Sequence, residues 1–173
     1  PDLTPPLPFA ADSIAGNPVQ LADIDGDGYI DLLYSYQKAD GTIVRAFYKN
    51  ERTASGGRRW AEQLGSGLIP PQAFPFAIEK AGDLGVRIVD LNGDGRPDML
   101  VGVLRAKSVN DESVDKCETV SGQERCTLNR DLFDVAAFIN DGTKWVRSTG
   151  HAPPLPFVAR QARPQDPTTD LFV

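Results

Sequence analysis

Two nine-residue segments of this chain share one acidic, glycine-rich pattern: Asp23-Ile24-Asp25-Gly26-Asp27-Gly28-Tyr29-Ile30-Asp31 and Asp90-Leu91-Asn92-Gly93-Asp94-Gly95-Arg96-Pro97-Asp98. Both copies follow the order D-x-[DN]-G-D-G-x-x-D. Oxygen-bearing side chains alternate with glycines, which favour sharp turns because they accept positive φ. Carboxylates gathered around one point would repel one another unless a cation lay between them. The repeated pattern therefore predicts two turns that each surround a cation.

Calcium is the cation that this oxygen set favours, because it binds six to eight hard oxygen ligands in irregular geometry. The predicted ligands are the side chains at loop positions 1, 3, 5 and 9 and the backbone carbonyl at position 7. They are Asp23, Asp25, Asp27, Tyr29 and Asp31 in the first loop, and Asp90, Asn92, Asp94, Arg96 and Asp98 in the second. We expect two calcium ions, with the first loop, which has one more carboxylate, binding its ion more tightly.

The main alternative to this interpretation is an EF-hand, which requires a glutamate at position 12 and flanking helices. Position 12 is Tyr34 in one loop and Val101 in the other. The apolar runs that follow the loops, 32–36 and 99–104, favour buried strands, although periodicity alone leaves a helix open. An acidic surface turn without a metal is the other alternative.

Composition limits the possible partners. The chain has 173 residues and a net charge of −6, and the two loops carry much of its acidity. No basic stripe indicates a nucleic-acid partner, no apolar run reaches membrane-spanning length, and no signal peptide is recognisable. The two cysteines, Cys117 and Cys126, flank a polar stretch, and this spacing predicts a disulfide across a hairpin or loop, with two free thiols as the alternative. A disulfide favours an oxidising, extracellular setting.

The chain is an internal repeat. A Pro-rich segment with a Phe precedes each loop, at 5–10 and 70–77, and occurs a third time at 153–158. We expect a first repeat at 1–69, a second at 70–150 with a cysteine-containing insertion at about 105–130, and the start of a truncated third at 151–173. Because the chain begins at Pro1 and ends within a repeat, we expect it to be part of something longer.

The sequence of each repeat predicts four strands, in the order strand, calcium turn, strand, hairpin, strand, hairpin, strand. Four antiparallel strands per repeat is the plan of a β-propeller blade, which needs neighbouring blades to cover its faces. The predicted fold class is therefore all-β, with two full blades and the start of a third, as part of a larger propeller. Further blades of the same chain or assembly are the expected partners.

The loops and the strands before them, 19–23 and 85–90, resemble FG-GAP or VCBS repeats, the calcium-binding blades of integrin α-subunits and of many secreted bacterial proteins. The resemblance covers nearly the whole chain. It implies calcium in the turn between the first two strands of each blade. It also implies an extracellular, secreted or cell-surface setting and a scaffolding or protein-interaction role, for example in an adhesin or a toxin-complex or Rhs-like shell.

Two further functions remain open from the sequence: a carbohydrate-binding lectin propeller, with a glycan ligand, and an accessory domain of a secreted hydrolase or lyase. We expect no enzymatic activity from these residues, because no nucleophile elbow, phosphate loop or zinc motif is present. The lone histidine, His151, lies in a predicted connector.

Overall fold

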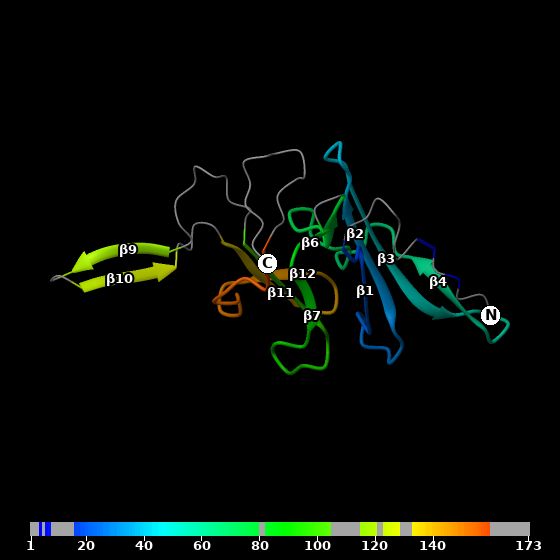
Figure 1. Ribbon diagram of the computed structural model, residues 1–173. Helices are drawn as coiled ribbons and strands as arrows, with labels where there is room; N and C mark the ends of the chain where they lie inside the picture. Colours follow the sequence, from blue (N-terminus) through cyan, green and yellow to red (C-terminus); the bar gives the residue numbers. More distant parts are fainter. Residues whose placement is uncertain are drawn as a thin grey trace.

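The computed structural model describes residues 4, 6–7, 16–79, 82–104, 115–120, 123–128 and 133–159. Every regular element in these residues is a β-strand, so the all-β class is confirmed for the part of the chain that is described. The strands form two larger sheets and a separate two-stranded one (Figure 1). No closed ring of sheets is formed within these residues.

The first sheet is built around a four-stranded antiparallel meander. Its strands are β1 (Val19–Ala22), β2 (Asp31–Gln37), β3 (Ile43–Arg52) and β4 (Arg58–Glu62), each paired with the next. The predicted hairpin turn between β2 and β3 is present, with Gly41 at a positive φ of 86°. The first acidic loop joins β1 to β2.

The second sheet repeats this meander. Its strands are β7 (Val86–Val89), β8 (Asp98–Leu104), β11 (Phe133–Asn140) and β12 (Trp145–Ser148), again paired in sequence order. The second acidic loop joins β7 to β8. Because strands flank both loops, the predicted strand–turn–strand frame is confirmed, and the helices that an EF-hand requires do not flank either loop.

The segment between β8 and β11, where the sequence predicts an insertion, contains a hairpin. Within the part of the chain that the structure describes, its strands β9 (Asp115–Val120) and β10 (Gln123–Leu128) pair with each other and with no other strand. Ser121-Gly122, a pair that the sequence predicts as a turn, lies outside the described residues, as do the residues that connect the hairpin to the sheet.

Short strands after each meander return to the sheet that precedes them. Strand β5 (Ala77–Ile78) runs parallel to the end of β2 and also pairs with β6 (Gly82–Asp83). Strand β13 (Val158–Ala159) runs parallel to the end of β8 in the same way. The segments that open the expected second and third repeats therefore belong to the sheet of the repeat before. The rest of the expected third repeat, 160–173, lies outside the described residues.

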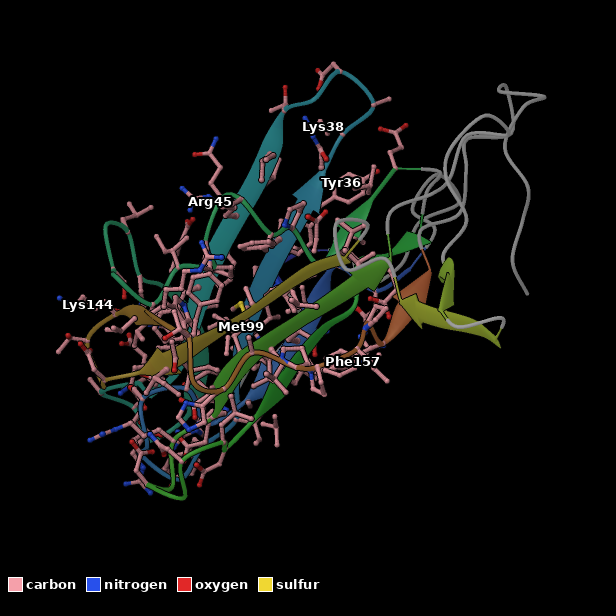
Figure 2. All side chains as sticks on the ribbon, turned by 90° about the vertical axis from the view of Figure 1, so that its left-hand side faces the viewer. Tyr36, Lys38, Arg45, Met99, Lys144 and Phe157 are labelled. Carbon is pink, nitrogen blue, oxygen red and sulfur yellow. The ribbon has the colours of Figure 1, made fainter. Side chains whose placement is uncertain are left out.

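The main hydrophobic core lies between the two larger sheets. Leu33 and Phe47 of the first sheet and Met99 and Val101 of the second belong to one buried cluster (Met99 is labelled in Figure 2). Side chains alternate along a strand, so Leu32 and the tyrosines of β2 lie on the other face, in a second cluster. Because both faces are covered, β2 is buried along nearly its whole length, including the polar residues Asp31 and Ser35.

Candidate metal-binding loops

The first loop brings three acidic side chains together. Asp23, Asp25 and Asp27 each place a carboxylate oxygen within 4.8 Å of the others. The backbone folds around them. Asp23 accepts hydrogen bonds from the backbone N–H groups of Asp27 (2.9 Å) and Gly28 (2.8 Å). Gly26 and Gly28 have positive φ values of 77° and 86°, which side-chain-bearing residues rarely adopt, so glycine is required at both turns.

The second loop has nearly the same backbone conformation. Gly93 and Gly95 have φ values of 77° and 85°, and Asp90 accepts a hydrogen bond from the N–H of Gly95 at 2.9 Å. The N–H of Asp94 is bound by the Asn92 side-chain oxygen at 2.9 Å. In this loop the side-chain oxygen at position 3 comes from the amide of Asn92, so two carboxylates, those of Asp90 and Asp94, stand where the first loop has three.

The residue at position 7 donates its N–H to the carboxylate at position 5 in both loops. The distances are 3.0 Å from Tyr29 to Asp27 and 2.9 Å from Arg96 to Asp94. The pKa of Asp94 is lowered mainly by the hydrogen bond from the Arg96 N–H and, to a lesser extent, by the hydrogen bond from the Asn92 side chain. The predicted use of the position 7 carbonyls as ligands remains a prediction.

Asp31 and Asp98, at position 9, are fully buried and have a different environment from the other acidic residues. Asp31 accepts the N–H of Ile24 at 3.0 Å and the N–H of Asn50 at 2.9 Å, one with each oxygen. Burial raises the pKa of the Asp31 carboxyl to about 6, against the effect of these two hydrogen bonds. Neither position 9 side chain belongs to the converging group.

The second sheet repeats this arrangement. Asp98 accepts the N–H of Leu91 at 2.9 Å and the N–H of Asn140 at 2.8 Å. Each position 9 carboxylate therefore ties the loop to the end of the third strand of its meander. This backbone role was not predicted from the sequence. The predicted role of both residues as ligands remains a prediction.

Two further groups near the loops were missed by sequence reasoning. The ammonium of Lys49, on β3, contacts Asp25 and lies 3.0 Å from an oxygen of Asp27. The hydrogen bond to Asp25 is the main cause that raises the pKa of Lys49 well above its ordinary value. The other group is the Asn140 side chain, which donates to the carbonyl of Ile24 at 2.7 Å and so joins the second sheet to the first loop.

The residues of both loops fit a hard divalent cation. Their side-chain donors are carboxylate and amide oxygens, which calcium prefers, whereas structural zinc sites are built mainly from Cys and His. The first loop has three carboxylates close enough to share one ion. The second has two carboxylates and an amide oxygen at the corresponding positions. The structure therefore shows a cluster that could hold a metal ion in the first loop.

The predicted disulfide has the backbone register that it needs. Cys117 and Cys126 lie directly opposite each other in the antiparallel pair of β9 and β10. Directly opposed residues in such a pair have Cα atoms about 4.5 to 5.5 Å apart, which a disulfide can bridge. The bond itself remains a prediction.

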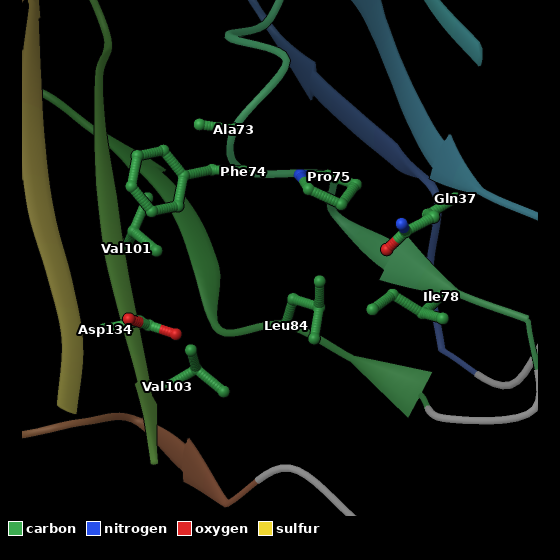
Figure 3. Close-up of a pocket in the computed structure, with 9 residues that line it drawn as sticks. All are labelled: Gln37, Ala73, Phe74, Pro75, Ile78, Leu84, Val101, Val103 and Asp134. Carbon is green, nitrogen blue, oxygen red and sulfur yellow. The ribbon is translucent and has the colours of Figure 1, made fainter. Parts of the chain in front are cut away.

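A cavity of about 260 Å³ lies between the two larger sheets, away from both loops (Figure 3). Phe74, Leu84 and Val101 supply apolar side chains to its wall, and Gln37 and Asp134 face it from β2 and β11. It contains one acidic group and no second metal-ligating side chain, so it does not compete with the loops as a metal site.

The described residues contain no helix long and apolar enough to cross a membrane. No protein-family model matches the chain, and no significant match was found among curated proteins or solved structures.

Proposed function

We propose that the chain is a calcium-stabilised, non-catalytic segment of a β-propeller. In this proposal it serves as an extracellular scaffold or protein-interaction module of a larger secreted or surface protein. The observation that carries the proposal is the convergence of Asp23, Asp25 and Asp27 in a loop whose backbone is reproduced at Asp90–Asp98. Two loops with matching φ values at both glycines, in the same place in two sheets, favour a shared ligand over two unrelated turns.

The role of the ion in this proposal is structural. In the first loop Asp23, Asp25 and Asp27 would hold it, and in the second Asp90, Asn92 and Asp94. A bound divalent cation would offset the mutual repulsion of these side chains. Since each loop joins the first two strands of its meander, the ion would hold that turn in the conformation that aligns them.

The propeller part of the proposal is supported by the way the sheets stack. The face of the first sheet that carries Leu33 packs on the face of the second that carries Met99. In β7 and β12, Ile88 and Trp145 pack against this shared core. Alternation places Val89 and Val146 on the opposite face, where they are 44% and 41% exposed. A further sheet stacked against this face would cover Val89 and Val146, as neighbouring repeats do in repeat proteins.

The experiment that tests calcium binding is isothermal titration of the metal-free chain with CaCl₂, with MgCl₂ as the comparison ion. We expect binding of two calcium ions. The variant Asp27→Ala/Asp94→Ala should lose both, because each change removes the position 5 carboxylate. Asp40→Ala, which removes an acidic side chain from a hairpin turn outside the loops, should bind as wild type does. A chain that releases no heat and shows no affinity for calcium would refute the proposal.

A further inference from the structure

The ammonium of Lys49 lies against two of the three converging carboxylates of the first loop. It contacts the carboxylates at loop positions 3 and 5, Asp25 and Asp27, and its side chain is only 29% exposed. Lys49 is carried by β3, where its neighbour Asn50 is held by the position 9 carboxylate of the same loop. The lysine is thus anchored to the loop by the sheet itself.

Among the described residues, no lysine forms an ion pair with the second loop. Asn50 pairs with Trp60 across β3 and β4, and Asn140 pairs with Trp145 across β11 and β12. This shared register makes Ile139 the counterpart of Lys49. Among the described residues, the cationic group that pairs with the second loop is the Arg96 guanidinium, 4.0 Å from an oxygen of Asp94 and 42% exposed. The two loops therefore differ in an internal positive charge as well as in the number of carboxylates.

We propose that Lys49 is a built-in counter-cation of the first loop, and that its ammonium must leave Asp25 and Asp27 before calcium binds there. This inference rests on the proposed calcium binding. Without metal, Lys49 offsets the repulsion between the converging carboxylates and keeps the loop folded. With metal, it opposes the ion, because two cations then share one set of oxygens. The number of carboxylates alone therefore overstates the calcium affinity of the first loop.

The test measures one loop at a time in the full chain. Asp94→Ala disables the second loop, and in that background Lys49→Met is compared with Lys49 by calcium titration. Methionine keeps much of the length of lysine and removes its charge. We expect calcium to bind about tenfold more tightly or better, since a like charge within a few ångströms is lost. Lys49→Gln is the second variant, with the same expected direction.

The control is Lys38→Met in the same background. It removes an identical charge at the opposite end of β2 from the loop (Lys38 is labelled in Figure 2) and should leave the affinity unchanged. The reciprocal experiment places Ile139→Lys in an Asp27→Ala background, where only the second loop can bind. We expect its calcium affinity to fall about tenfold.

Thermal unfolding of the metal-free proteins gives a readout that does not depend on calcium. Lys49→Met should melt at a lower temperature than wild type in chelator, and the difference should shrink or reverse in calcium. A lysine that is merely structural would lower the melting temperature in both conditions and leave the calcium affinity unchanged, which would overturn the inference while leaving calcium binding intact. Absence of calcium binding in every variant would overturn both proposals.

Discussion

At the scale of single residues, the position 9 aspartates explain how each loop is fastened to its sheet. Asp31 and Asp98 each accept two backbone N–H groups, one from the loop and one from the third strand of the meander. A buried carboxylate that binds two donors also prevents those donors from being left unsatisfied, and an unsatisfied buried donor costs about 1 to 3 kcal/mol.

We expect Asp98→Ala to lower the free energy of unfolding by about 2 to 4 kcal/mol even in chelator, because it leaves the N–H groups of Leu91 and Asn140 without their partner. Urea denaturation followed by circular dichroism measures this. Glu51→Ala is the control: it removes a surface ion pair with Arg59, and such pairs contribute about 0 to 1 kcal/mol. Equal effects of the two changes in chelator would show that the hydrogen bonds of Asp98 to Leu91 and Asn140 do not stabilise the fold.

At the scale of elements, the strand order and the loop frame could be predicted because their signals are local. Glycines at fixed spacing identify the turns, and apolar runs beside them identify strands such as β2 and β8. Lys49 and Asn140 could not be predicted in the same way. Lys49 reaches an aspartate 24 residues away, and Asn140 reaches a carbonyl 116 residues away. Those contacts depend on the pairing register and on how the sheets stack, which no local pattern specifies.

Gly67, which lies between β4 and β5, forms an isolated β-bridge with Lys144 in the turn between β11 and β12. A Cβ atom at Gly67 would lie 2.6 Å from the Thr143 carbonyl oxygen and 2.7 Å from the Lys144 Cβ. We expect Gly67→Ala to destabilise the chain by about 1 to 3 kcal/mol, because backbone must move to admit the methyl group. A thermal melt measures this.

Gly150→Ala is the matched control for that change. Its added methyl group meets nothing within 4 Å and its φ lies outside the positive range, so its melting temperature should stay near that of wild type. If Gly67→Ala melts like Gly150→Ala, the close approach between the hairpin and the first sheet is absent in solution.

At the scale of the whole molecule, the two larger sheets share one interior and each keeps a face turned away from it. Val101 lies in that interior and is 1% exposed, whereas Val146, on the far face of the second sheet, is 41% exposed. Valine therefore occurs on both the buried and the exposed face of the second sheet, so the same substitution can be compared on the two faces.

We expect Val101→Ala to lower the free energy of unfolding by about 1 to 3 kcal/mol, because it removes buried methyl groups and leaves a cavity between the sheets. Val146→Ala should change it by less than about 0.5 kcal/mol, as is usual for exposed positions. Chemical denaturation of both variants at equal protein concentration gives the comparison. A larger loss for Val146→Ala would mean that the sheets stack through the opposite face.

Calcium should act on the stability of the molecule as a whole. If free calcium exceeds the dissociation constant about 100-fold, each bound ion adds about 2.7 kcal/mol to the free energy of unfolding. We therefore expect chelator to lower the melting temperature of the wild-type chain and to have no effect on Asp27→Ala/Asp94→Ala. Calorimetry in calcium and in chelator measures both, and identical wild-type melts would contradict the prediction.

The bond from Asn140 to the carbonyl of Ile24 has a consequence for modularity. The donor, Asn140, belongs to the second repeat, and the acceptor, the Ile24 carbonyl, lies inside the loop of the first. The first loop therefore depends on the second repeat for one of its hydrogen bonds. A fragment cut at the boundary that the sequence repeat suggests would lose this bond, and β5 would be severed from the sheet to which it belongs. A segment that could be duplicated or recombined without breaking these contacts would therefore have different boundaries from the sequence repeat.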